Sequence, residues 1–285
     1  MNKRFFAVLM ILLLSLGASL PAQAAPVTPH LQIDGIDVTS IAKPEWKHNH
    51  MMVPLRMIVE SLGGSVQQSK DGILITQASH IVRVTPGRTS AMINGKTIRL
   101  DGAPYIHKGS TYVPLRFVAE TMGASVSYTS GNIVITSKPL QIGKSTIKAT
   151  QFEYHMTMGG VVEQVYGNAY TRQLYNILVS NKGKQVQEPD DYSWQNTIDI
   201  PGSYYKNIQY DFLDAKGKTV ARYDTYYLIT KMGTDPSKEY PDRLIHDVTA
   251  DRWYVMKHDV VDPTQIQLNR AENNGFIVII SNTVV

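Results

Sequence analysis

Apolar and polar residues follow two different patterns along the first half of the chain, and each pattern predicts its own kind of element. Residues 55–62 and 115–122 carry apolar side chains three and four positions apart, which is typical of a helix with one buried face. Residues 73–76 and 133–136 are short runs rich in β-branched residues, which predict strands. Because helices stand between strands, we expect an α+β domain here.

These elements belong to an internal repeat with a period of 60 residues. Residues 31–79 and 91–139 are identical at 14 of 49 aligned positions, against about three expected from average composition. Each unit opens with a dipeptide typical of tight hairpin turns, Asp34-Gly35 or Asn94-Gly95. We therefore predict a β-hairpin, a helix and a second β-hairpin in each unit. The shared motif residues are Val53, Pro54, Leu55, Arg56, Glu60 and Gly63 in the first unit, and Val113, Pro114, Leu115, Arg116, Glu120 and Gly123 in the second.

One charged pair recurs in both units at helical spacing, as Arg56 with Glu60 and as Arg116 with Glu120. Arginine ahead of glutamate is the weaker order for such a pair on a helix. Its recurrence suggests that at least one partner bonds to something outside the helix. We interpret the whole motif as structural, with a tie to a neighbouring strand or loop, and ligand binding is the alternative.

The pattern changes after a short linker, and residues 145–285 read as strands separated by turn residues. A short helix is predicted near residues 243–247. The spacing of the strands predicts a second, mainly β, sandwich-like domain. The predicted strands are 147–158, 170–180, 197–200, 206–214, 219–227, 253–258, 265–269 and 275–280.

Aromatic residues concentrate in this second domain, which holds 13 of the 16 tyrosines. Adjacent tyrosines on a strand point to opposite faces of the sheet, so one of each pair is expected to face outward. Trp194, Tyr204 and Tyr205 lie near loops and form a candidate ligand face for sugars or proteins. Packing in the core or across strands is the alternative.

Residues 1–24 have the composition of a cleavable export signal. Lys3 and Arg4 precede an apolar run at 5–14, and Ala22-Gln23-Ala24 matches the small-residue cleavage pattern. An uncleaved anchor is the alternative, but the run is short for a membrane span. We expect a secreted or cell-wall-associated protein with no membrane span after cleavage.

Charge and composition narrow the choice of partner. The chain has no cysteine, which excludes a disulfide scaffold, a thiol nucleophile and an iron–sulfur cluster. Residues 25–139 carry 11 Lys and Arg against 7 Asp and Glu, and residues 140–285 carry 15 against 17. The basic half has no run of Lys and Arg, so no nucleic-acid binding is expected. A mildly basic exported domain suits contact with an anionic wall polymer, and an ordinary solvated surface is the alternative.

The motif V-P-L-R-x-x-x-E-x-x-G-x-x-V, following I-[DN]-G and present twice, resembles the copper amine oxidase N-terminal domain family. This is the "stalk" domain of exported bacterial proteins, common in Gram-positive lineages. The resemblance covers residues 31–139 and implies a small α+β module with strands wrapped round helices. It also implies a peripheral role, because in copper amine oxidases this domain stands apart from the catalytic core and holds no metal.

Amine oxidase activity is not expected from the residues themselves. No asparagine is followed by tyrosine, so the motif that forms the quinone cofactor is missing. His48 and His50 match the His-x-His spacing of copper ligands and would point the same way on a strand, but the second unit has Lys108 and Ser110 there. We treat these histidines as weak metal candidates and predict no catalytic residue and no cofactor.

The sequence therefore predicts an exported, non-enzymatic protein in which a stalk module carries a β-domain with a structural or binding role at the cell wall. The expected partner is a cell-wall polymer or another envelope protein. One alternative is a secreted protein-binding or inhibitory sandwich presented by the stalk. A more remote alternative is a hydrolase whose site assembles from residues distant in sequence.

Overall fold

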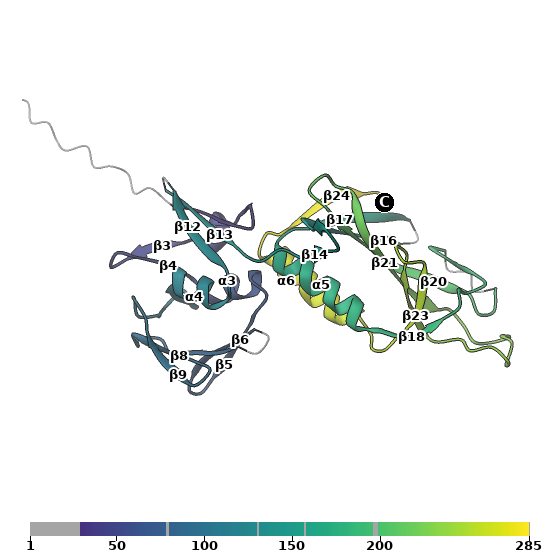
Figure 1. Ribbon diagram of the computed structural model, residues 1–285, viewed down its shortest axis with the longest axis horizontal. Helices are drawn as coiled ribbons and strands as arrows, with labels where there is room; N and C mark the ends of the chain where they lie inside the picture. The colour runs from purple at the N-terminus through teal and green to yellow at the C-terminus, as the bar shows by residue number, and fades with distance from the viewer. Residues whose placement is uncertain (1–28, 78–79, 130, 157, 196–198, 285) are drawn as a thin grey trace, which may run out of the picture.

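The computed structural model describes residues 29–77, 80–129, 131–156, 158–195 and 199–284. The predicted export signal, residues 1–24, lies outside the described residues. Two domains lie end to end along the longest axis of the molecule (Figure 1). Within the described ranges, no helix is both long enough and apolar enough to cross a membrane.

The N-terminal domain contains the two repeat units, joined by strand β7 (His80–Val84). The first unit comprises β1 (His30–Ile33), β2 (Ile36–Asp37), α2 (Thr39–Ala42), β3 (Glu45–Lys47), β4 (His50–Pro54), α3 (Leu55–Ser61), β5 (Ser65–Ser69) and β6 (Gly72–Gln77). The second comprises β8 (Ser90–Ile93), β9 (Lys96–Arg99), β10 (Tyr105–His107), β11 (Ser110–Pro114), α4 (Leu115–Thr121), β12 (Ser125–Thr129) and β13 (Asn132–Thr136).

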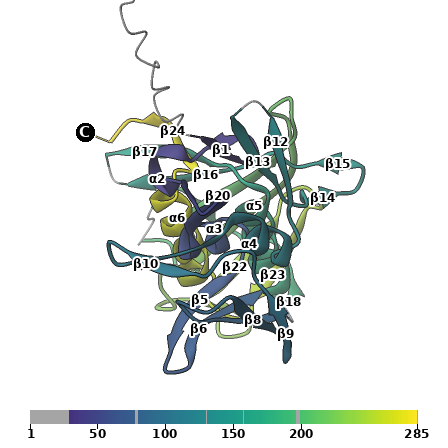
Figure 2. The same ribbon diagram turned by 90° about the vertical axis from the view of Figure 1, so that its left-hand side faces the viewer.

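The two units are joined by strand pairing. Strand β4 pairs with β11 so that Val53 lies opposite Val113, its own repeat equivalent. Strand β1 pairs in parallel with β13, which brings the end of the second unit beside the start of the first. Helices α3 and α4 contact each other and lie between the β12-β13-β1-β2 sheet and the β5-β6-β7-β8-β9 sheet (Figures 1 and 2).

Local chemistry explains where the elements of each unit turn and end. Asp34 and Gly35 have φ values of 52° and 90°, the left-handed backbone that a two-residue hairpin of this type requires. Gly63 and Gly123 follow α3 and α4 with φ values of 88° and 73°. This left-handed residue lets the chain leave a helix at once, and glycine adopts it without steric cost.

The C-terminal domain is built on one mainly antiparallel sheet, in which only the short β19 pairs in parallel among the described residues, with two helices on one face (Figure 1). In the described residues its strand order is β18-β23-β22-β21-β20-β16-β17-β24, and the short β19 pairs with β20. After the small hairpin of β14 (Gln141–Ile142) and β15 (Ser145–Thr146), its elements are β16 (Ala149–Met156), β17 (Gly159–Val165), α5 (Asn168–Ser180), β18 (Lys182–Val186), β19 (Tyr192–Ser193), β20 (Tyr204–Leu213), β21 (Thr219–Leu228), β22 (Arg243–Asp247), β23 (Arg252–Met256), α6 (Val261–Asn273) and β24 (Ile277–Asn282).

The sandwich prediction for this domain is wrong, although the domain is rich in strands as expected. The predicted strands 170–180 and 265–269 are parts of α5 and α6. In α5 the buried residues Tyr170, Leu174 and Leu178 recur every four positions, close to the helical period of about 3.6 residues. The predicted helix at 243–247 is strand β22, whose residues are buried on both faces and so show no alternation.

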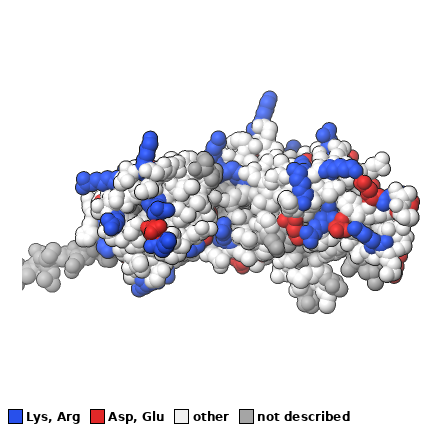
Figure 3. Space-filling view, turned by 90° about the horizontal axis from the view of Figure 1, so that it is seen from below, with Lys and Arg blue, Asp and Glu red and all other residues white. Residues whose placement is uncertain are grey.

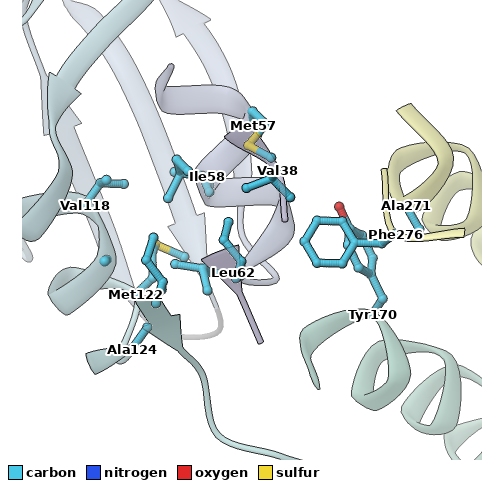
Figure 4. Packing of buried hydrophobic residues seen from close by; sticks show 14 of the residues in the cluster. Val38, Met57, Ile58, Leu62, Val118, Met122, Ala124, Tyr170, Ala271 and Phe276 are labelled. Carbon is cyan, nitrogen blue, oxygen red and sulfur yellow. The ribbon is translucent and has the colours of Figure 1, made fainter. Parts of the chain in front are cut away.

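The two domains share one hydrophobic core. Val38 and Leu62 of the N-terminal domain belong to the same buried cluster as Tyr170, Ala271 and Phe276 of the C-terminal domain. Figure 4 shows these two sets of side chains facing each other across the domain boundary. A core that continues from one domain into the next indicates a fixed arrangement rather than a hinge.

A carboxylate from the first repeat unit reinforces this boundary. Asp34 accepts hydrogen bonds from the Ser137 backbone N–H (2.7 Å), the Ser137 hydroxyl (2.9 Å) and the Asn168 backbone N–H (2.9 Å). Asn168 is the first residue of α5, and the preceding N-cap residue is Gly167, which has no side chain to bond the free N–H groups. Asp34 therefore caps a helix of the other domain.

Candidate ligand-binding site

A pocket of about 670 Å³ opens in the C-terminal domain. Its walls are residues 184–190, which begin in β18, and the loop 238–241. Strand β18 lies at the end of the molecule away from the N-terminal domain (Figure 1). The volume falls in the range of about 300–1,000 Å³ that is usual for small-molecule sites.

The floor of the pocket is aromatic and apolar. Tyr204 of β20 and Leu244 of β22 line it, and both belong to a buried cluster with Tyr226 and Trp253. The Tyr204 hydroxyl donates a hydrogen bond to the Pro241 carbonyl at 2.8 Å. Burial raises the pKa of the Tyr204 phenol far above its usual range, so this group stays neutral and serves as a fixed floor.

Two ion pairs join the walls across the rim. Lys184 Nζ lies 2.9 Å from Glu239 Oε2, and Lys238 Nζ lies 2.8 Å from Asp190 Oδ2. Pairing with Lys184 lowers the pKa of Glu239, and pairing with Asp190 raises that of Lys238. All four side chains are exposed, and exposed ion pairs contribute little to stability. The rim can therefore exchange its partners for charged groups of either sign on a ligand.

A network of charged and polar side chains lies on β20, the strand that carries Tyr204, and on the neighbouring β21. Lys206 Nζ lies 2.6 Å from Asp224 Oδ2 and donates to Gln209 at 2.9 Å. Arg222 donates two hydrogen bonds of 3.1 Å to the carboxylate of the same Asp224. Burial lowers the pKa of Lys206, although Asp224 opposes this effect. These charges satisfy one another, as buried charges must, which indicates a structural role.

Trp194, Tyr204 and Tyr205 do not form one exposed face, so this prediction is corrected. Tyr204 is only 3% exposed. The Trp194 ring stacks on the His155 imidazole at 4.1 Å, and Lys206 Nζ lies 4.6 Å from its centre. The Tyr205 hydroxyl donates to the His155 carbonyl at 2.9 Å. Packing therefore uses all three side chains, and Tyr204 alone lines the pocket.

His48 and His50 do not share one face of a strand, as the His-x-His spacing had suggested. His48 has a left-handed φ of 46° in the turn between β3 and β4, and His50 begins β4. Lys108 occupies the same turn position in the second unit with a φ of 47°. In the part of the chain that the structure describes, no three or more His, Cys, Asp or Glu side chains gather as a metal site would require.

The repeat motif packs the centre of the N-terminal domain. Val53, Leu55, Val113 and Leu115 are buried. Arg56 Nη1 lies 3.4 Å from Glu60 and donates to the Val66 carbonyl in β5 at 3.1 Å. The equivalent Arg116 differs. Its Nε lies 3.7 Å from Glu120, and its guanidinium lies 5.4 Å from the centre of the Tyr128 ring.

Sequence reasoning missed the charged residues of the pocket rim, which include Lys184, Asp190, Lys238 and Glu239. Their two segments read as polar loops without a hydrophobic period. Lys184 and Glu239 are 55 positions apart, and Asp190 and Lys238 are 48 apart. Residues 235–251 form a polar stretch that contains Pro236 and Pro241, but this composition does not reveal which segment it pairs with.

Comparison with known proteins found a family match for the N-terminal domain. Residues 32–137 match the family model of the copper amine oxidase N-terminal domain, which confirms the resemblance found in the sequence. The match ends before the C-terminal domain begins. No curated protein and no solved structure matches the chain.

Proposed function

We propose that the protein is exported and acts at the cell envelope as a non-enzymatic binding protein. The pocket of the C-terminal domain holds the ligand, and the N-terminal domain is its rigid support. The observation that carries the proposal is a pocket with an aromatic floor and exposed charges of both signs at its rim. The signal-like composition of residues 1–24 supports export.

The rim chemistry favours a ligand that bears both amino and carboxyl groups. Lys184 and Lys238 offer cations, while Asp190 and Glu239 offer carboxylates. A uniformly anionic polymer would satisfy only the two lysines and would be repelled by the acidic pair. A wall polymer that carries short peptides has both kinds of group. We therefore favour such a polymer as the ligand.

The test is retention of purified residues 25–285 on isolated cell-wall sacculi. We use the whole chain because a cut between the domains would expose the core around Tyr170 and Phe276. The variant Lys184→Glu reverses one charge at the rim. Its control is Lys231→Glu, because Lys231 forms a similar exposed ion pair with Asp242 but does not line the pocket.

We expect Lys184→Glu to lower retention about tenfold and Lys231→Glu to leave it unchanged. Retention of the unaltered protein should fall between about 0.1 M and about 1 M salt, since the Debye length shortens from about 10 Å to about 3 Å. Equal retention of Lys184→Glu and Lys231→Glu would show that the pocket does not bind the wall polymer. No retention of the unaltered protein would overturn envelope binding itself.

Strand β24 favours a second candidate function, the docking of another protein. It is an edge strand, paired with β17 on one side. Val278, Ile279 and Ile280 are each about half exposed, and an exposed apolar edge strand readily accepts a further strand. If sacculi retain nothing and a soluble extracellular partner binds the protein but not its Ile279→Lys variant, this function replaces the first.

A further inference from the structure

A second hollow, of about 260 Å³, lies in the N-terminal domain where the two repeat units meet. The first unit contributes Trp46 and His50, and the second contributes Asp101, Arg116 and Tyr128. The volume is below the range of about 300–1,000 Å³ that is usual for small-molecule sites. It therefore suits one small ring rather than an extended chain.

Two large aromatic side chains at this hollow remain accessible. Trp46 is 58% exposed and Tyr128 is 42% exposed. An exposed tryptophan offers a broad, flat apolar surface on which the ring of a ligand can stack.

The internal repeat shows that the fold does not require these two aromatic residues. Ile106 stands at the position equivalent to Trp46, and Gln68 stands at the position equivalent to Tyr128. Asp101 and His50 likewise correspond to Ile41 and Ser110. The strands and helices that carry Trp46, His50, Arg116 and Tyr128 have counterparts in the other unit, whereas Asp101 stands where the first unit forms α2. The chemistry of the hollow is thus a property of this one site and not of the repeat.

Arg116 supplies the hollow with a cation. Its repeat equivalent Arg56 uses Nη1 to bond the Val66 carbonyl at 3.1 Å. Arg116 is held by longer contacts, 3.7 Å to Glu120 and 5.4 Å to the Tyr128 ring, and its side chain is 57% exposed. A guanidinium held in this way over an aromatic ring can still bind a carboxylate or phosphate through two parallel hydrogen bonds.

The charge of the N-terminal domain as a whole also favours an anionic ligand. On the face seen in Figure 3, Lys and Arg side chains outnumber acidic ones over the N-terminal domain, while the C-terminal domain shows both signs. Residues 25–139 carry 11 Lys and Arg against 7 Asp and Glu. Such an excess of positive charge raises the local concentration of anions.

We propose that this hollow binds a single sugar ring that carries an acidic group. The apolar face of the sugar stacks on Trp46, and the acidic group pairs with Arg116. Asp101 and His50 offer acceptors and donors for the sugar hydroxyls. This site lies in a different domain from the pocket described above and acts independently of it.

The test is titration of residues 25–285 with pairs of monosaccharides that differ only by an acidic group. The pairs are N-acetylmuramic acid with N-acetylglucosamine, and glucose 6-phosphate with glucose. Binding is followed by calorimetry and by tryptophan fluorescence. Trp253 is 3% exposed and Trp194 is stacked on His155, so quenching by a bound sugar reports mainly on Trp46.

We expect the acidic member of at least one pair to bind at least about tenfold more tightly than its neutral partner. Trp46→Ala should weaken this binding about tenfold, while Ile106→Ala, at the equivalent exposed position, leaves it unchanged. Arg116→Gln should abolish the preference for the acidic member but keep the weaker binding of the neutral one. Thermal unfolding of each variant checks that it is folded.

Three results would overturn the proposal. One is that no acidic sugar binds at millimolar concentration. Another is that Trp46→Ala binds as tightly as the unaltered protein. The third is that neutral and acidic members of both pairs bind equally.

Discussion

The cap that Asp34 provides across the domain boundary can be measured by replacing this residue with glycine. Asp34 has a φ of 52°, a backbone that glycine adopts freely, so the turn survives the change. The carboxylate loses two hydrogen bonds from Ser137 and one from Asn168. The free N–H of α5 is then left without its cap.

The second repeat unit offers a matched control. Asn94 occupies the same turn position with a φ of 47°, and it accepts one hydrogen bond, from the Ile81 N–H at 2.9 Å. Asn94→Gly makes the unfolded chain more flexible to the same extent as Asp34→Gly does. In the folded protein, however, it loses only the hydrogen bond from Ile81. The difference between the two variants in free energy of unfolding therefore measures what the contacts of Asp34 across the domain boundary contribute.

The expected difference follows from the bonds lost. Each hydrogen bond from Ser137 contributes about 1 kcal/mol and the cap of α5 about 1 kcal/mol, so Asp34→Gly loses about 3 kcal/mol beyond the glycine effect. Asn94→Gly loses about 1 kcal/mol on the same basis. Asp34→Gly should therefore be less stable than Asn94→Gly by about 2 kcal/mol.

Urea unfolding, followed by circular dichroism and by tryptophan fluorescence, measures these differences. The two probes should give one shared transition, because the domains share a core. Asp34→Asn should recover part of the loss, since asparagine keeps an acceptor oxygen and tolerates the left-handed backbone. Equal stability of Asp34→Gly and Asn94→Gly would refute the role assigned to Asp34.

Three further predictions concern other parts of the chain. Protein recovered from the culture medium should begin at Ala25, and mass spectrometry that finds residues 1–24 still attached would contradict cleavage. Burial lowers the pKa of His246 below its usual 6.5, so as pH falls through 6.5 this residue binds a proton in the unfolded chain before it does so in the folded protein. The free energy of unfolding should therefore decrease below pH 6.5. In urea unfolding at about pH 5.5, His246→Gln should show a smaller decrease. Gly63→Ala should cost more stability than Gly123→Ala, although both glycines are left-handed, because a methyl group at Gly63 would displace Gln173 Nε2 from its 2.8 Å hydrogen bond to the Gly63 carbonyl and lie 3.3 Å from Ala169 Cβ; equal changes in melting temperature would show that this crowding relaxes.

The sequence by itself determined the local structure of the N-terminal domain. The dipeptides Asp34-Gly35 and Asn94-Gly95 mark the turns, and the apolar stripes mark α3 and α4. These features depend on neighbours a few residues apart, so one segment contains all the information needed to predict them. The same reasoning failed for α5, where tyrosine and β-branched residues favour a strand but burial in a shared core decides for a helix.

Only the tertiary structure decided which distant segments meet. The pairing of β1 with β13, the cap that Asp34 gives to α5, and the rim pair of Lys184 with Glu239 each join residues far apart along the chain. The hollow beside Trp46 likewise draws its residues from both repeat units. Such contacts leave no periodic trace, because neither segment carries a pattern that specifies its partner. They are also the contacts that form both proposed binding sites and join the two domains.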